Sequence, residues 1–184
     1  MSRSESAQGA PRRERMSIEQ VNALTQEEFK AALGHLFEGS PWIAEQAWQA
    51  RPFRNVQHLH EEMCRVMYEA PVERQLALIR AHPDLVGRAA LAGTLSPEST
   101  REQSAAGLDR LTPQEIATFT RLNRQYRQKF GFPFVICARE NRKESILTGF
   151  ATRLRNTREQ EIATALAEIA KIARLRLLDA VYDA

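Results

Sequence analysis

No stretch of this 184-residue sequence is apolar over enough residues to cross a membrane, and the N-terminus lacks the apolar centre of a secretion signal. A spanning helix needs about 20 mostly apolar residues. Only two cysteines occur, Cys64 and Cys137, and their surroundings are unlike each other. This scarcity excludes a disulfide framework as a first interpretation and predicts a protein of the reducing cytoplasm.

A strong charge of one sign is also lacking. The net charge is +3, and four arginines fall within residues 1–15, so the remainder of the chain is nearly balanced. The composition therefore does not indicate the broad basic face of a nucleic-acid-binding protein. The sequence also has no glycine-rich phosphate loop, no His-Glu-x-x-His motif and no nucleophile elbow, so it shows none of the usual signatures of nucleotide, zinc-peptidase or serine-hydrolase chemistry.

What is present is the composition of an ordinary globular domain, with 43% hydrophobic and 27% charged residues. Residues 1–15 are polar and contain almost nothing that could be buried. We therefore predict a disordered N-terminal leader over residues 1–15 and a single domain over residues 16–184.

Helix start signals recur along this domain. Thr25 and Thr112 each stand three residues before a glutamate, in the capping-box pattern. Ser40 and Ser96 each precede a proline, the order that suits a cap followed by a first helical residue. A long C-terminal helix is expected from about residue 157 to 181.

Two further helices are expected, one over residues 56–68 and one from Pro71 towards His82. Only the run from Phe134 to Cys137 is β-like, and it has no partner strand. The predicted class is an all-α, single-domain multi-helix bundle.

His82 stands where one of these helices must stop, because it precedes Pro83 in the sequence His-Pro-Asp-Leu. A histidine at a helix C-terminus feels the negative pole of the helix dipole, which favours its protonated form. We therefore predict that His82 can donate a proton. The alternative is an ordinary capping or surface histidine.

The C-terminal helix carries a charge within its apolar stripe. At about 100° per residue, Ile162, Leu166, Ile169 and Ala173 share one face, and Arg176 falls within about 40° of its centre. One interpretation is that the stem of Arg176 packs along the helix while its head reaches water. The other is that Arg176 lines a pocket and meets a carboxylate of a substrate or of the protein.

Two other segments could present polar groups to a small molecule. Ser99, Glu102 and Gln103 share one helix face through their i, i+3 and i+4 spacing, although a solvated face is the simpler interpretation. Residues 129–138 are too apolar for a surface loop and too rich in Gly and Pro for a helix. Their backbone groups need partners, which a substrate could supply, unless the segment is only an aromatic turn that fills the core.

Other candidates are weaker. His58, His60 and Cys64 could suggest a metal site, but the two histidines fall on opposite sides of a helix, so surface positions are the better interpretation. Cys137 lies in an apolar run and is better explained as a small core residue than as a nucleophile.

Taken together, these residues resemble the 2-oxo-4-hydroxy-4-carboxy-5-ureidoimidazoline (OHCU) decarboxylase family. The resemblance covers about residues 17–182 and rests on Arg51–Pro52–Phe53 and the blocks LALIRAHPDLVGRAALAG, LSPESTREQSAAGLDRL, LNRQYRQKFGFPFVICARE and IAKIARLRLLDAV. It implies an all-α, usually dimeric enzyme, without cofactor or metal, that decarboxylates this ureidoimidazoline to (S)-allantoin in the last step of urate breakdown.

The resemblance also implies roles for particular residues. His82 corresponds to the catalytic proton donor, Glu102 to its acidic companion and Arg176 to a third polar group. Substrate contacts are expected from Pro83, Ser99, Thr100, Arg101, Gln103, Phe134, Val135, Ile136, Cys137 and Ala138.

Three rivals stay open: a decarboxylase or lyase for a related ureide acid, a non-catalytic helical binding module on the same fold, and a helical nucleic-acid binder. The C-terminal sequence Val181–Ala184 is no peroxisomal address, which again predicts a cytoplasmic protein. The expected partners are a small ureidoimidazoline substrate and a second copy of the chain, with no nucleic acid and no membrane.

Overall fold

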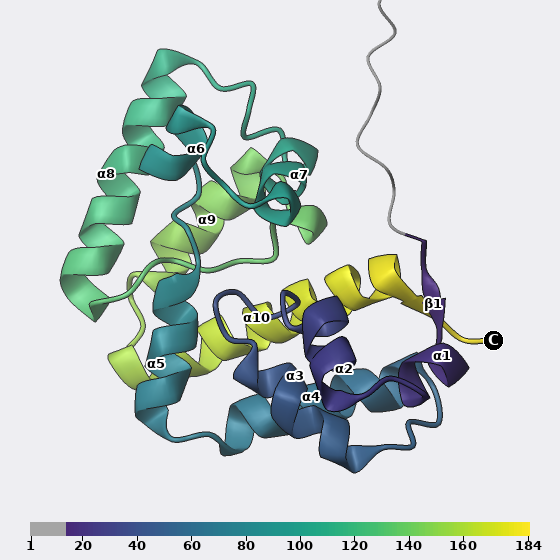
Figure 1. Ribbon diagram of the computed structural model, residues 1–184. Coiled ribbons are helices and arrows are strands. Elements are labelled where there is room, and N and C mark those ends of the chain that lie inside the picture. Colours follow the sequence, from purple (N-terminus) through teal and green to yellow (C-terminus); the bar gives the residue numbers. More distant parts are fainter. Residues whose placement is uncertain (1–13) are drawn as a thin grey trace, which may run out of the picture.

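The computed structural model describes residues 14–184, and its regular secondary structure is almost entirely helical, as predicted (Figure 1). Residues 1–13 of the predicted leader lie outside the described residues. The helices are α1 (Ile18–Asn22), α2 (Gln26–Leu33), α3 (Trp42–Ala47), η1 (Trp48–Ala50), α4 (Val56–Glu69), α5 (Val72–Ala81), α6 (Arg88–Ala92), α7 (Pro97–Ala105), α8 (Pro113–Phe130), η2 (Ala138–Glu140), α9 (Lys143–Arg153) and α10 (Arg158–Ala180). Within residues 14–184 the only strands are β1 (Met16–Ser17) and β2 (Val181–Tyr182), which pair in parallel.

Most of the predicted helix starts are confirmed by their hydrogen bonds. Thr25, Thr112 and Thr157 each close a complete capping box, and the Ser96 side chain accepts the backbone N–H of Ser99. Ser40 is the exception, because α3 begins after it without a side-chain cap. Pro41, which follows Ser40, already has helical dihedral angles, and it is the Ser40 carbonyl that accepts the N–H of Ile43.

The β-like run predicted at residues 134–137 is an irregular segment without a strand partner. Gly131 ends α8 in the left-handed conformation, with φ 81°, and Pro133 then prevents a return to the helix. The rings of Phe130, Phe132 and Phe134 surround buried Tyr126, with centroid distances of 4.5, 6.0 and 5.4 Å. The segment therefore fills the core with its side chains while its backbone stays irregular.

Helix α10 packs against α4, α5 and α8. In Figure 1, helices α6 to α9 occupy the upper part of the view and α1 to α4 the lower part, with α5 and α10 between them. None of the helices within residues 14–184 is long and apolar enough to cross a membrane.

The two ends of the described chain meet beside β2. The Arg15 guanidinium donates to the Val181 carbonyl at 3.2 Å and lies 5.5 Å from the ring centre of Tyr182. The Asp183 carboxylate accepts the N–H of Val56 at 2.8 Å. Among the described residues, Arg15 of the predicted leader thus already contacts the domain.

The cap of α10 can be tested by replacing Thr157 with alanine. We expect Thr157→Ala to lower the free energy of unfolding by about 1 kcal/mol, because the backbone N–H of Gln160 loses its side-chain acceptor. Thr164→Ala is a matched control, since the Thr164 hydroxyl only donates to the Gln160 carbonyl within the same helix. Equal losses for both variants in denaturant titrations would contradict a capping role for Thr157.

Candidate active site

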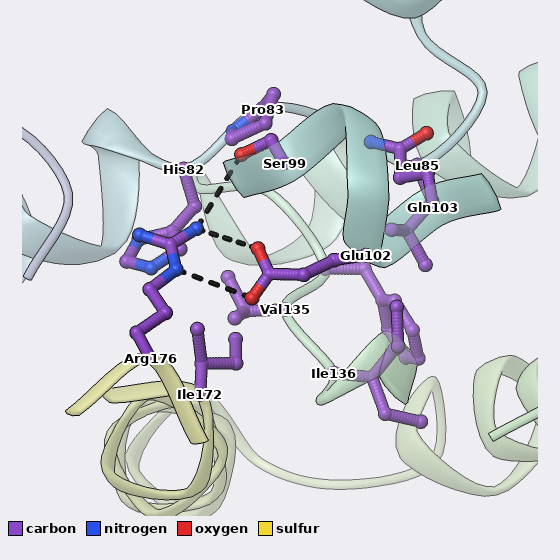
Figure 2. Close-up of a pocket in the computed structure, with 12 residues that line it drawn as sticks. His82, Pro83, Leu85, Ser99, Glu102, Gln103, Val135, Ile136, Ile172 and Arg176 are labelled. Carbon is purple, nitrogen blue, oxygen red and sulfur yellow. Dashed lines mark hydrogen bonds and ion pairs between the residues drawn. The ribbon is translucent and has the colours of Figure 1, made fainter. Parts of the chain in front are cut away.

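Three polar side chains from distant parts of the chain, His82, Glu102 and Arg176, converge on one pocket (Figure 2). They come from the end of α5, from α7 and from α10. The pocket has about 390 Å³ of empty space, its mouth included. It is lined by His82, Pro83, Leu85, Ser99, Glu102, Gln103, Phe134, Val135, Ile136, Ala138, Ile172 and Arg176.

His82 ends α5 as predicted, with the extended backbone that the following proline demands. Its side chain does not point off the helix, however. The ring folds back, and Nδ1 lies 2.9 Å from the Leu78 carbonyl oxygen. Because a carbonyl can only accept, Nδ1 carries the proton of the neutral ring and Nε2 keeps a lone pair. Within residues 14–184, no hydrogen bond from the protein reaches Nε2.

Burial decides the charge of His82. It lowers the pKa of the imidazole to about 4, outweighing the Leu78 carbonyl and the Glu38 carboxylate, which both act to raise it. The prediction that the helix end favours the protonated form is therefore wrong, because desolvation is the larger effect. At neutral pH the His82 ring is therefore uncharged, so it must accept a proton as a base before it can donate one as an acid.

Arg176 lines the pocket and meets protein carboxylates, rather than sending its head to water. Nε donates to Glu102 Oε2 at 3.1 Å, and Nη2 donates to Glu102 Oε1 at 2.7 Å. Nη1 donates to Glu38 Oε2 at 2.8 Å. Longer contacts of 3.5 Å reach Ser99 Oγ and the His35 carbonyl. All five N–H groups of the guanidinium thus point to protein acceptors.

The positive charge of Arg176 is therefore paired with carboxylates of the protein itself. Burial alone would lower the pKa of its guanidinium, but the hydrogen bonds and charges of Glu102 and Glu38 outweigh burial and raise that pKa. Arg176 stays a cation that fixes the Glu102 carboxylate in the pocket. Each Glu102 oxygen retains a second lone pair, with which it can accept a hydrogen bond from a ligand.

The three side chains predicted to share one face of α7 do so, whereas two neighbours that the resemblance named do not. Ser99, Glu102 and Gln103 are all buried and line the pocket. Thr100 and Arg101 are exposed and do not line it, because a step of about 100° per residue turns them to the outside of the helix. The Thr100 hydroxyl donates to the Ser96 carbonyl instead.

The loop that follows His82 is held by amide side chains. Gln103 Oε1 accepts the Val86 N–H at 3.1 Å, and Gln103 Nε2 lies 3.4 Å from the Asp84 carbonyl. Asn123 Nδ2 donates to the Leu85 carbonyl at 2.8 Å. Val86 has φ 53°, a left-handed conformation that strains a β-branched residue and persists only when its surroundings enforce it. Gln103 therefore positions the loop of His82 as well as lining the pocket.

The backbone of residues 134–138 forms another wall of the pocket. Among the described residues, none accepts a hydrogen bond from the N–H groups of this segment. Four of its residues line the pocket, whereas Cys137 does not. The Cys137 carbonyl accepts from the side chain of Asn141 and the N–H of Glu140. A buried segment with unused donors can bind the oxygen atoms of a ligand.

Sequence reasoning missed the buried network that supports this wall. Arg153 Nη1 donates to the Val135 carbonyl at 2.6 Å, and its guanidinium lies 4.2 Å from the Phe134 ring centre. Glu161, which is completely buried, accepts from Arg153 Nε at 2.7 Å and from the Tyr126 hydroxyl at 2.5 Å. A charged residue at the edge of an apolar helix face is a signal that could have identified Glu161. The stripe predicted on α10 did not include it, because the buried face of this helix is wider than that stripe.

The weaker sequence candidates lie elsewhere. His58 Nδ1 accepts the Arg54 N–H, and His60 Nε2 bonds to the Ala170 carbonyl at 2.8 Å. Within the part of the chain that the structure describes, no cluster of three or more such side chains could hold a metal ion. Burial raises the pKa of the Cys137 thiol to about 11, so this residue is a core thiol at neutral pH.

A helical domain whose pocket gathers a neutral imidazole, a fixed carboxylate and free backbone donors is suited to acid–base chemistry on a small polar molecule. The model of the OHCU decarboxylase family matches residues 22–178, and the chain belongs to this family.

Two curated relatives support this assignment, both named 2-oxo-4-hydroxy-4-carboxy-5-ureidoimidazoline decarboxylase. The relative from Amia calva is 44% identical over 90% of this chain and 95% of its own length. The relative from Halalkalicoccus jeotgali is 39% identical over 89% of this chain and 90% of its own length. A solved structure, described as (S)-allantoin synthase, matches with a TM-score of 0.70 and 27% identity. That match covers 89% of this chain and 53% of the solved chain, so our chain spans about half of that protein.

The charge state of His82 predicts how stability depends on pH. An unfolded histidine takes up its proton near pH 6.5, whereas folded His82 does so only near pH 4. Between these values the unfolded state binds more protons, so the free energy of unfolding falls as the pH is lowered from 7 to 4. His82 should account for roughly 3 kcal/mol of this fall, at about 1.4 kcal/mol per pKa unit. In denaturant titrations, we expect the free energy of unfolding of His82→Asn to fall by roughly 3 kcal/mol less than that of the wild type between pH 7 and pH 4. Plots of this free energy against pH that run parallel for the two proteins would contradict burial of a neutral ring.

Proposed function

We propose that this protein decarboxylates OHCU to (S)-allantoin and CO2, the last step of urate degradation, without a cofactor. The observation that carries the proposal is the convergence of His82, Glu102 and Arg176 on one pocket in a chain of this family. The three residues that the family resemblance named as catalytic line this pocket together, and Arg176 and Glu102 meet at hydrogen-bond distances.

The proposed reaction suits a site that offers acid–base groups. In the substrate, the departing carboxylate sits on a carbon that also bears a hydroxyl and adjoins the carbon of a C=N bond. When the C–CO2 bond breaks, its electron pair can form a double bond to the neighbouring carbon, while the C=N pair moves onto nitrogen, which takes a proton. The hydroxyl then loses its proton and becomes the carbonyl of the product, as the neighbouring carbon is protonated. The protein must move these protons and choose one face for the new C–H bond.

In this proposal, Nε2 of His82 acts first as a base. It accepts the proton of the substrate hydroxyl and can return a proton to carbon on the same side of the ring. Glu102 accepts a hydrogen bond from a substrate N–H or O–H. Arg176 acts by fixing Glu102, because its three short hydrogen bonds go to Glu102 and Glu38 and its other two N–H groups already lie 3.5 Å from protein acceptors. Arg176 is thus a positioning residue, although the sequence pattern also allowed it to bind an anion directly.

The remaining groups would bind and orient the substrate. The N–H groups of residues 134–138 can donate to the carboxylate, carbonyl and ureido oxygens, and Ser99 offers a hydroxyl in the same pocket. Pro83, Leu85 and Ile172 supply apolar surface that excludes water around the reacting carbons.

The proposal can be tested by generating the substrate in situ from urate and following the optical activity of the product by circular dichroism. The wild-type protein should accelerate formation of (S)-allantoin over the spontaneous reaction, which gives a racemate. His82→Asn and Glu102→Gln should each slow the reaction by about 100-fold or more, the usual loss when a general acid or base is removed.

The matched control is Thr100→Ala, which changes an exposed residue between Ser99 and Glu102 on the outside of α7. This variant should keep the wild-type rate. A folded His82→Asn protein that converts substrate at the wild-type rate would remove His82 from the mechanism. Absence of acceleration by the wild-type protein would favour a non-catalytic module, and acceleration with another ureide acid alone would favour the related lyase.

We further propose, from the family resemblance, that the protein is a homodimer and works in the cytoplasm. Light scattering should give twice the mass of one chain, and a monomer at micromolar concentration would contradict the dimer. Cell fractionation would test the location.

A further inference from the structure

Arg176 is shared by two carboxylates from different parts of the chain. Glu102 belongs to α7, whereas Glu38 lies in the connection between α2 and α3. The Glu38 contact is nearly as short as the better Glu102 contact, 2.8 Å against 2.7 Å. Glu38 is largely buried, with 18% of its side chain exposed. A second carboxylate is not needed to pair one guanidinium, so its presence calls for a further reason.

The connection that carries Glu38 is pressed against the end of α5. Gly39 has φ 57°, and a side chain at this position would place its Cβ 3.0 Å from the Cβ of Ala81, the residue before His82. Only glycine combines this backbone conformation with so close an approach. The chain therefore brings Glu38 to the end of the helix that stops at His82.

We infer that Glu38 is a positioning residue for catalysis, which balances the positive charge that His82 gains when it takes up a proton from the substrate. Glu102 is then left to face the substrate. This inference rests on the proposed function, since it assigns a role within that reaction.

The charges around His82 support this division. Burial is the strongest influence and lowers the pKa of His82. Against it act the Leu78 and Ile79 carbonyls of α5 and the Glu38 carboxylate, while Arg176 of α10 adds to the lowering. With His82 neutral, the two carboxylates and the guanidinium carry one excess negative charge, and a protonated His82 neutralises it. An imidazolium formed in the pocket thus meets a charge already in place, rather than requiring solvent to reorganise.

The decisive variants are Glu38→Gln, which removes the charge and keeps the shape, and Glu38→Asp, which keeps the charge at a greater distance. Glu45→Gln is the control, because Glu45 is a nearby carboxylate that pairs with Lys30 at the surface. Loss of a charge close to an ionisable group shifts its pKa by about one unit. We therefore expect Glu38→Gln to lower kcat roughly tenfold at neutral pH with KM within about twofold. The acid limb of the kcat profile should move to lower pH.

A second readout does not depend on activity. NMR of the His82 ring, assigned with His82→Asn, should show a smaller protonated fraction at pH 4.5 in Glu38→Gln than in the wild type, with Glu38→Asp between them. Glu45→Gln should match the wild type in both experiments. If the wild-type protein has no decarboxylase activity, the proposed function fails, and this NMR comparison still tests the pairing of Glu38 with His82.

Two results would overturn the inference. One is a Glu38→Gln protein with wild-type kcat and wild-type His82 protonation. The other is a loss of kcat in which the acid limb and the NMR titration stay unchanged, since that describes a merely structural residue. Should Glu38→Gln not fold, the comparison of Glu38→Asp with the wild type decides in the same way.

Discussion

The buried ion pair between Arg176 and Glu102 is the constraint on which the pocket depends. It joins α10 to α7 through two parallel hydrogen bonds of 3.1 and 2.7 Å, between two side chains that are both buried. Removing the cation of such a pair costs about 3–5 kcal/mol, because the carboxylate is left buried alone. The pair also fixes the direction of the Glu102 carboxylate. A carboxylate held in a fixed position can orient a small substrate in the pocket.

The rest of the site is irregular backbone held by buried polar side chains. Gln103 and Asn123 hold the loop that follows His82, and Arg153 holds the carbonyl of Val135 beneath the opposite wall. Glu161 pairs with Arg153, just as Glu102 and Glu38 pair with Arg176. The segment of residues 134–138 is thereby fixed while its N–H groups stay free for the substrate. The loop after His82 is fixed in the same way while the imidazole stays free. This arrangement explains how a small all-α domain keeps non-helical backbone at the centre of its fold.

Local signals predict the helices well, because capping residues and prolines act within a few positions of themselves. Arg176 can be found from sequence for a similar reason: a charge within an apolar stripe needs a partner. The resemblance, by contrast, names the whole segment from Ser99 to Gln103, and only the turn of α7 separates Thr100 and Arg101 from the pocket. The sequence mispredicts the charge of His82, since burial is a tertiary property that outweighs the helix dipole. Glu38 has no signal at all, because it lies in a connection without periodicity.

In the proposed mechanism, Arg176 contributes to decarboxylation through Glu102. A double-mutant cycle on kcat/KM with Arg176→Met, Glu102→Gln and both together tests it most directly. If Arg176 acts only by fixing the carboxylate, the double variant should be about as slow as Glu102→Gln alone. If the two losses multiply, Arg176 also acts by a route other than Glu102, either on the substrate or through the charge of His82, and its assignment as a residue that works only by fixing Glu102 is wrong.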